Sequence, residues 1–161
     1  MFSEKEIWDI LAEVEDPEIP VINVVEMGIV RGVQIEGDIV KVTITPTYSG
    51  CPAMKTIEED IREILVEKKV PSFEVNTVLS PAWTTDWMTD IAKEKLRSTG
   101  IAPPVGTSSD KGLLMGKVRD VRCPRCGSKN TSMISQFGST ACKSLYKCND
   151  CLDPFDYFKC I

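Results

Sequence analysis

Six of the seven cysteines gather between Cys123 and Cys160. Four of them form two pairs, Cys123 with Cys126 and Cys148 with Cys151, and each pair has two residues between its sulfurs. A tight turn at that spacing lets both thiolates face one ion, and a tetrahedral Zn²⁺ takes four such sulfurs at about 2.3 Å. The spacing therefore predicts a zinc ribbon with these four cysteines as ligands.

Two other interpretations of the same cysteines stay open. A disulfide framework would need an oxidising compartment, whereas the chain opens directly on an amphipathic pattern rather than a secretory signal, so we expect reduced thiols. An iron–sulfur cluster is the other alternative, because Cys142 and Cys160 supply two more sulfurs. We interpret these two first as small buried hydrophobic residues and second as extra or exchangeable ligands.

The seventh cysteine, Cys51, precedes a stretch with helical periodicity. We expect Pro52 at the first position of that helix, which is where proline is tolerated, and Cys51 at its N-cap. Unpaired N–H groups and the positive end of the helix dipole favour a thiolate there. Cys51 could act as a nucleophile, a redox group or a soft-metal ligand. The equally open alternative is a small thiol packed beneath the turn.

Asp16 opens an acidic loop that contains two prolines, residues 16–20. Because Pro17 disfavours helical angles at the residue before it, this loop is expected to end the first helix. The loop is either a plain helix terminator or a functional rim.

The composition of the chain excludes some classes of function and argues against others. The chain has no histidine, which excludes histidine acid–base catalysis and histidine metal ligands. Residues 117–161 carry a net charge of +4 and the rest −9, within a total of −5. A Zn²⁺ with four thiolates would reduce the tail to about +2, which argues against a nucleic-acid partner. No apolar run approaches the length of a membrane span.

The elements that would position these thiols give an α+β pattern. Ser3 and Glu6 form a capping box for the first helix. Alternating apolar residues then predict a β-hairpin and a third strand, with a helix on either side of that strand. We therefore expect an N-terminal α-β-β-α-β-α domain whose helices cover one sheet. Its strands are expected at residues 29–36, 39–45 and 72–79, and its last helix at 91–98.

Glycine, proline and serine are frequent in residues 101–116, which predicts a linker. The expected organisation is a domain over residues 1–100, this linker, and a zinc ribbon over residues 117–161. The ribbon is short enough to need its metal for stability. Its expected hairpin has strands at 130–137 and 144–147.

Several short motifs give the N-terminal part a family resemblance. It resembles the small domain shared by bacterial SufT-like proteins and the eukaryotic cytosolic iron–sulfur targeting factor, a domain implicated in maturing iron–sulfur proteins. The motifs are Asp16-Pro17-Glu18, Glu26-Met27-Gly28-Ile29-Val30, the segment 45–52 around Cys51, and Pro81-Ala82-Trp83-Thr84.

The tail makes the resemblance more specific. Residues 137–143 (FGSTACK) and 154–160 (PFDYFKC) resemble PaaD (PaaJ), an accessory component of the phenylacetyl-CoA oxygenase (epoxidase) system. The resemblance covers nearly the whole chain and implies a cytoplasmic bacterial protein of aerobic phenylacetate breakdown. It implies assembly or delivery of the iron–sulfur cluster of the oxygenase's reductase component. By position, Cys51 would be the functional cysteine and Asp16 the acidic residue of the opening motif.

Two functions follow as hypotheses. As a maturation factor, the protein would hold iron or a cluster transiently at Cys51. One cysteine cannot complete a four-sulfur shell, so a homodimer or a partner's cysteines would be required. The ribbon would dock on the client through Phe155, Tyr157 and Phe158. The alternative is a non-catalytic zinc-ribbon adaptor or structural subunit of the oxygenase complex. A catalytic role is disfavoured, because no general base lies near Cys51 in the sequence.

Overall fold

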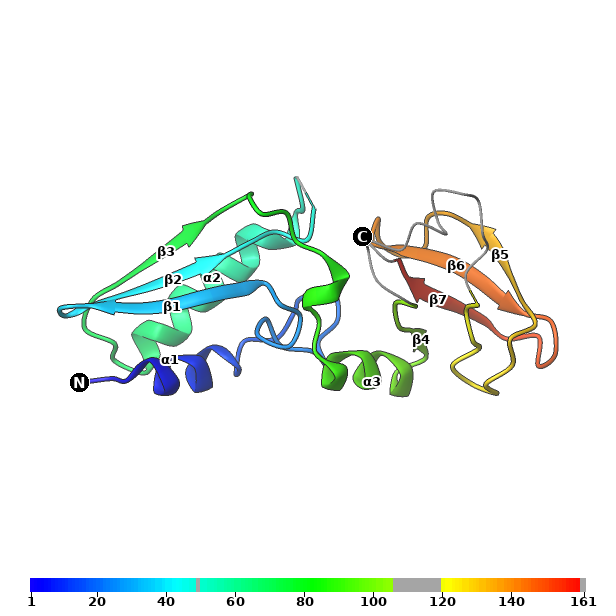
Figure 1. Ribbon diagram of the computed structural model, residues 1–161, viewed down its shortest axis with the longest axis horizontal. Coiled ribbons are helices and arrows are strands. Elements are labelled where there is room, and N and C mark those ends of the chain that lie inside the picture. Colours follow the sequence, from blue (N-terminus) through cyan, green and yellow to red (C-terminus); the bar gives the residue numbers. More distant parts are fainter. Residues whose placement is uncertain (49, 106–119, 160–161) are drawn as a thin grey trace. The chain divides into compact units, whose positions relative to one another are not determined.

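The chain forms two compact units (Figure 1). This computed structural model describes residues 1–48, 50–105 and 120–159. The first unit comprises Met1–Trp83 and Trp87–Thr89, and the second comprises Thr84–Asp86 and Asp90–Ile161. Both are mixtures of helix and strand, which confirms the predicted α+β class. Most of the predicted linker and Cys160 lie outside the described residues.

The first helix, α1 (Glu4–Leu11), begins at the predicted capping box. The Glu6 carboxylate accepts a hydrogen bond from the backbone N–H of Ser3 at 2.7 Å, and the Ser3 hydroxyl accepts one from the N–H of Glu6 at 3.3 Å. The helix ends before the Asp16 loop. Val14 follows the helix and is still buried.

A three-stranded sheet in the order β1-β2-β3 forms the centre of the first unit. The hairpin strands are antiparallel, as predicted, and β3 joins β2 in parallel after the crossover through α2. A register irregularity between Val30 and Gly32 allows both Val30 and Val33 to be buried. The elements are β1 (Val30–Glu36), β2 (Ile39–Ile44), α2 (Ala53–Glu67) and β3 (Phe73–Thr77).

The core of this unit lies between the sheet and the helices. Ile57, Ile61 and Leu65 form the buried stripe of α2, and α1 and α2 contact both the sheet and each other. Trp83 closes one side of the core, since it is 3% exposed and its indole N–H donates to the carbonyl of Met27 at 3.0 Å. The third strand ends at Thr77 rather than at the expected residue 79, and Leu79 is exposed.

The second unit contains a four-stranded sheet in the order β4-β7-β6-β5. Strand β6 pairs antiparallel with β5 and β7, and β4 pairs in parallel with β7. The helix predicted to end the N-terminal domain, α3, instead groups with this unit, because it packs against β4. The elements are α3 (Asp90–Ser98), β4 (Ile101–Ala102), β5 (Thr131–Ser135), β6 (Lys143–Cys148) and β7 (Pro154–Phe158).

Strand β7 corrects the expectation for the ribbon's aromatic residues. Phe155, Tyr157 and Phe158 are 4%, 5% and 1% exposed, so the prediction that they dock on a client is wrong. Phe155 and Tyr157 are buried because they pack in the core cluster of the ribbon with Val121 and Cys148. Tyr146 of β6 stacks on Phe155 with 5.9 Å between ring centroids and meets Tyr157 edge-on at 5.4 Å.

Among the described residues, no helix is both long enough and apolar enough to cross a lipid bilayer.

Candidate functional site

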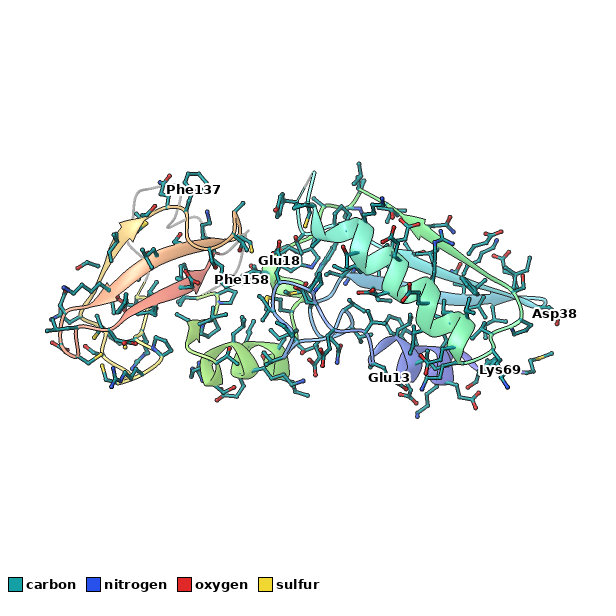
Figure 2. All side chains as sticks on the ribbon, turned by 180° about the vertical axis from the view of Figure 1, so that it is seen from behind. Glu13, Glu18, Asp38, Lys69, Phe137 and Phe158 are labelled. Carbon is teal, nitrogen blue, oxygen red and sulfur yellow. The ribbon has the colours of Figure 1, made fainter. Side chains whose placement is uncertain are left out.

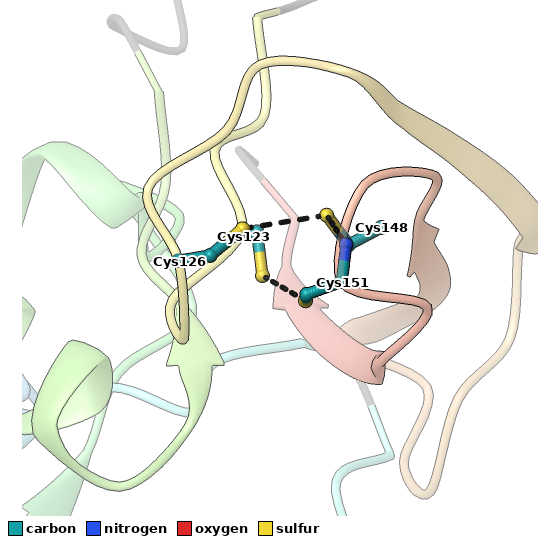
Figure 3. Close-up of side chains that lie close together, drawn as sticks. All are labelled: Cys123, Cys126, Cys148 and Cys151. Carbon is teal, nitrogen blue, oxygen red and sulfur yellow. Dashed lines mark hydrogen bonds between the residues drawn. The ribbon is translucent and has the colours of Figure 1, made fainter.

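The four paired cysteines converge on one point (Figure 3). The Sγ atoms of Cys123 and Cys151 are 3.7 Å apart, and those of Cys126 and Cys148 are 3.5 Å apart. All four sulfurs lie within 4.8 Å of one another. Bonds of about 2.3 Å at tetrahedral angles would separate the sulfurs by about 3.8 Å. The donor set therefore fits a single tetrahedral ion such as Zn²⁺.

The same separations bear on the two alternatives. A disulfide places its sulfurs about 2.05 Å apart, so neither close pair is bonded. A cluster of several irons spreads its cysteine ligands more widely than one ion does. The geometry thus favours a mononuclear centre.

Both metal knuckles close with a left-handed residue. Gly127, directly after the first pair, has φ +76° and donates its N–H to the carbonyl of Cys123 at 2.9 Å. The second pair has no glycine there, and Leu152 takes the same place with φ 65°. The two knuckles therefore have the same left-handed backbone conformation at this position, although one residue is glycine and the other leucine.

The backbone around the second knuckle favours a thiolate at Cys148. The N–H of Cys151 points at the Cys148 sulfur from 3.5 Å. This N–H, opposed by burial and assisted by the N–H of Asp150, lowers the pKa of the Cys148 thiol to about 7. A thiolate is the form that binds a metal ion, so one ligand is prepared near neutral pH.

Polar contacts join the two knuckles outside the sulfurs. The carboxylate of Asp150 accepts hydrogen bonds from the Ser128 hydroxyl and, at 3.0 Å, from the Asn130 amide. These two donors lower the pKa of Asp150. Arg125 of the first knuckle also pairs with Asp153 after the second, at 3.2 Å. These contacts add polar links between the two turns beside the four sulfurs.

The tail has two further cysteines outside the pairs, Cys142 and Cys160. Cys142 is 5% exposed, its sulfur lies 2.9 Å from the Thr140 hydroxyl, and it is not a member of the four-sulfur group. That burial agrees with its interpretation as a small buried residue. Cys160 lies outside the described residues.

Cys51 lies just before α2 and is half-buried. Pro52 is the N-cap and the helix begins at Ala53, one residue later than expected. The Thr47 hydroxyl donates to the Cys51 sulfur at 3.7 Å, a contact that the sequence reasoning missed because it depends on the curvature of the loop. The sulfur is therefore neither sealed in the core nor fully exposed.

The carboxylate of Asp16 accepts hydrogen bonds within its own loop. Asp16 is 5% exposed, and its Oδ1 accepts hydrogen bonds from the N–H groups of Glu18 at 2.8 Å and Ile19 at 3.0 Å. A groove of about 400 Å³ runs beside this loop, and Cys51 is not among the residues that line it. Its carboxylates come from two distant segments, which no local pattern could have revealed: Glu13, Glu15, Asp16, Asp60, Glu63 and Glu67.

Comparison with known proteins identifies both units. Residues 4–80 match the family model "Iron-sulfur cluster assembly protein", and residues 107–159 match "PaaD zinc beta ribbon domain". A protein of Escherichia coli K12, named as a subunit of 1,2-phenylacetyl-CoA epoxidase, is 50% identical over 97% of this chain and 92% of its own length. The chain belongs to the PaaD family. The family resemblance inferred from the motifs is thereby confirmed.

The first unit of this PaaD family member also has shorter relatives. A Porphyromonas gingivalis "Fe-S protein maturation auxiliary factor" is 36% identical over 58% of the chain and 90% of its own length. A solved structure from Bacillus anthracis, described as a domain of unknown function, has 31% identity and a TM-score of 0.55 over 58% of this chain and 90% of its own. A conserved hypothetical protein from Thermotoga maritima has 30% identity and a TM-score of 0.51, covering 59% and 94%.

Proposed function

We propose that this protein is an accessory factor of a phenylacetyl-CoA epoxidase and that it assembles or delivers the iron–sulfur cluster of the reductase component. The cluster, or its iron, is the cargo of the protein rather than a resident cofactor. The client is a cytoplasmic enzyme component, so the transfer takes place in that compartment.

The observation that carries the proposal is that one chain contains both an iron–sulfur assembly segment and a zinc-ribbon segment. The segment 4–80 matches an iron–sulfur cluster assembly family, and the segment 107–159 matches the PaaD zinc ribbon family. The first part offers the transfer chemistry and the second the link to the epoxidase. The names of the relatives point the same way, since one is an epoxidase component and others are maturation factors.

Within the first unit, Cys51 is the residue that we assign to the cargo. Its sulfur is half-buried just before the start of α2, so it is neither sealed in the core nor fully exposed. The Thr47 hydroxyl donates to that sulfur and orients it. A single thiolate can bind one edge of a cluster and release it again. The remaining ligands would come from a second protomer or from the client.

The four ribbon cysteines have a separate, structural role. They are assigned to Zn²⁺, which when bound supplies a cross-link between two turns and no reaction chemistry. The residues of this chain then hold the ion by sulfur and keep the two knuckles aligned through Asp150 and Arg125. We do not assign Asp16 a direct contact with the cargo, because its Oδ1 is engaged by its own loop.

The decisive experiment is Cys51→Ser in a strain that lacks the wild-type protein. We expect normal accumulation and zinc content of the variant, because the substitution replaces one small polarisable atom at a half-buried position. We expect the reductase to lose its iron–sulfur absorption and electron-spin resonance signals and growth on phenylacetate to fail. Thr47→Ser is the matched control, since it keeps the hydroxyl. A fully loaded reductase in the Cys51→Ser strain would refute the assignment.

An adaptor without transfer chemistry is the second candidate. The name of the Escherichia coli relative favours it, because that protein is called a component of the epoxidase itself. An adaptor would co-purify with the epoxidase at fixed stoichiometry, and Cys51→Ser would then leave cluster loading unchanged. A maturation factor is instead expected at substoichiometric levels.

A further inference from the structure

A cluster of exposed apolar side chains lies at the edge of the ribbon. Met133, Ile134 and Phe137 are 52%, 56% and 67% exposed. The first two belong to β5, the edge strand of its sheet within the described residues, and Phe137 lies in the turn that follows. A register irregularity between Met133 and Ser135 interrupts the alternation of β5, and Met133 and the following Ile134 are both exposed. Single exposed apolar residues need no explanation, but three within five positions on an edge strand and its turn are of the kind that partners cover. Figure 2 shows Phe137 at the surface of the ribbon, in contrast to Phe158.

The turn holds Phe137 in this exposed position. The N–H of Phe137 donates to the Ser135 hydroxyl at 3.2 Å. The carbonyl of the neighbouring Gln136 accepts hydrogen bonds from Lys159 at 2.8 Å and from the Ser144 hydroxyl at 3.2 Å. The Lys159 ammonium also lies 4.8 Å from the centre of the Phe137 ring. An aromatic ring that is ordered before binding loses little entropy when a partner covers it.

A close backbone approach fixes the rest of the turn. A Cβ at Gly138 would lie 2.6 Å from a carboxylate oxygen of Asp156, so a larger residue here would displace that side chain. Asp156 in turn accepts a hydrogen bond from Ser139 at 3.0 Å, and the N–H of Gly138 donates to the carbonyl of Lys143 at 2.8 Å. The segment 137–143, distinctive in the sequence, thus builds a rigid turn whose most exposed large side chain is Phe137.

The charge near the patch is positive. Lys159 contacts the Phe137 ring, and Lys147 is exposed on β6 opposite Ser132 of β5. Of the other lysines nearby, Lys143 is buried and Lys129 pairs with Asp120 at 3.7 Å. The carboxylate of Asp156 on β7 accepts a hydrogen bond from Ser139 of the turn. An apolar centre with cations beside it complements a protein segment that carries apolar and acidic side chains.

We infer that Met133, Ile134, Phe137 and Lys159, here named the β5 patch, form the docking surface for an acidic, apolar segment of an epoxidase component. Phe137 is the anchor and Lys159 both positions the ring and attracts the carboxylates. The inference rests on the proposed function only for the choice of partner. The β5 patch takes the docking role that the sequence had suggested for the aromatic residues of β7, which are buried and cannot reach a client.

Nucleic acid is the competing ligand for a basic surface with an aromatic residue. The protein as a whole has a net charge of −5, which repels phosphates at long range. The patch itself offers one stacking ring, whereas single-stranded nucleic acid is bound along a groove with several. A protein segment is therefore the occupant that these residues favour.

The test uses full-length, zinc-loaded protein and the purified epoxidase components of the same bacterium. A photo-crosslinking phenylalanine analogue at position 137 should attach to one component, in a peptide with more carboxylates than basic groups. Phe137→Ser should weaken binding of that component about tenfold, as expected for an exposed aromatic anchor. Lys159→Gln should weaken it less, and the wild-type affinity should fall as salt rises.

Val66→Ser is the matched control, because Val66 is 64% exposed but lies on α2 of the first unit. It should bind like wild type, and all variants should retain zinc and secondary structure. Cys51→Ser should also bind normally, so that a failure of the transfer proposal remains distinguishable from a failure of docking.

Four results would overturn the inference. They are undiminished binding by Phe137→Ser, absence of binding by the wild-type protein, crosslinks to a second copy of this chain, and crosslinks to a basic segment. Tight binding of a fluorescent oligonucleotide that Phe137→Ser abolishes would equally overturn it in favour of nucleic acid.

Discussion

Two residues with left-handed backbone angles show how the metal knuckles depend on single positions. Gly127 adopts φ +76° at no steric cost, whereas Leu152 adopts φ 65° with a Cβ that disfavours it. Leu152 is 63% exposed, so its side chain contributes little burial in return. The second knuckle therefore carries strain that the first does not.

This contrast predicts opposite effects of two substitutions. Leu152→Gly should raise the free energy of unfolding of the zinc-loaded protein by about 0.5 kcal/mol, because relief of strain slightly exceeds the entropy cost of glycine. Gly127→Ala should lower it by about 1 kcal/mol, since the added Cβ meets nothing within 4 Å and only the backbone angle is penalised. Urea unfolding measures both. Shifts of the same sign would contradict this account.

The cysteines of the tail should separate into two classes. Cys126→Ser should abolish stoichiometric zinc binding, because its sulfur lies 3.5 Å from that of Cys148 within the four-sulfur group. Cys142→Ser should retain zinc, because Cys142 is outside that group, and should lose only modest stability through its buried position. Elemental analysis of the purified variants measures their zinc content and tests this prediction. Zinc loss in Cys142→Ser would make it a ligand.

At the scale of elements, α1 is specified by its own first turn. The capping box satisfies two N–H groups that would otherwise lack partners, and Ile7 and Leu11 then anchor the helix in the core. The backbone N–H of Ser3 is the main cause of the lowered pKa of Glu6. Folding is thereby linked to the charge of this carboxylate.

This linkage predicts a pH-dependent effect. Ser3→Ala should cost about 1 kcal/mol at neutral pH. The contribution of Glu6 is present above its ordinary pKa of 4.5 and is lost as the pH falls through the lowered value, so the penalty for Glu6→Ala should shrink in acid. Glu4→Ala removes the same charge from the first turn without breaking the box and serves as the control. Equal pH profiles for the two variants would exclude the linkage.

At the scale of the molecule, the two units depend on different sources of stability. The first unit has many buried apolar residues, whereas the ribbon has a small core that includes two cysteines of the four-sulfur group, Cys123 and Cys148. Binding of structural zinc is worth about 10–16 kcal/mol in comparable peptides, more than a domain of this size otherwise has. The ribbon should therefore require its ion and the first unit should not.

Chelation tests this division. All three tryptophans, Trp8, Trp83 and Trp87, belong to the first unit. A strong chelator should remove about one zinc per chain and abolish the strand signal of the ribbon. Tryptophan fluorescence should remain native. Loss of that fluorescence on chelation would show that the first unit also depends on zinc.

Local patterns in the sequence were sufficient for several features of the protein. The four grouped cysteines followed from their spacing, the α1 cap from Ser3 and Glu6, and the hairpin from alternating residues. The cap and the hairpin depend on residues close together in the sequence. The cysteine group depends on the spacing that four ligands of one metal ion require. The family followed from motifs and was confirmed by comparison over nearly the whole chain.

Tertiary structure decided what depends on distant neighbours. The aromatic pattern of residues 154–158 permits a displayed or a buried strand. Packing of Phe155 and Tyr157 with Val121 and Cys148, from other segments of the ribbon, made it buried. The place of α3 depended on its contact with β4, and the exposure of Phe137 on a turn held by Lys159. Burial is a property of the assembled sheet rather than of any segment, which is the physical reason that the sequence alone could not assign these surfaces.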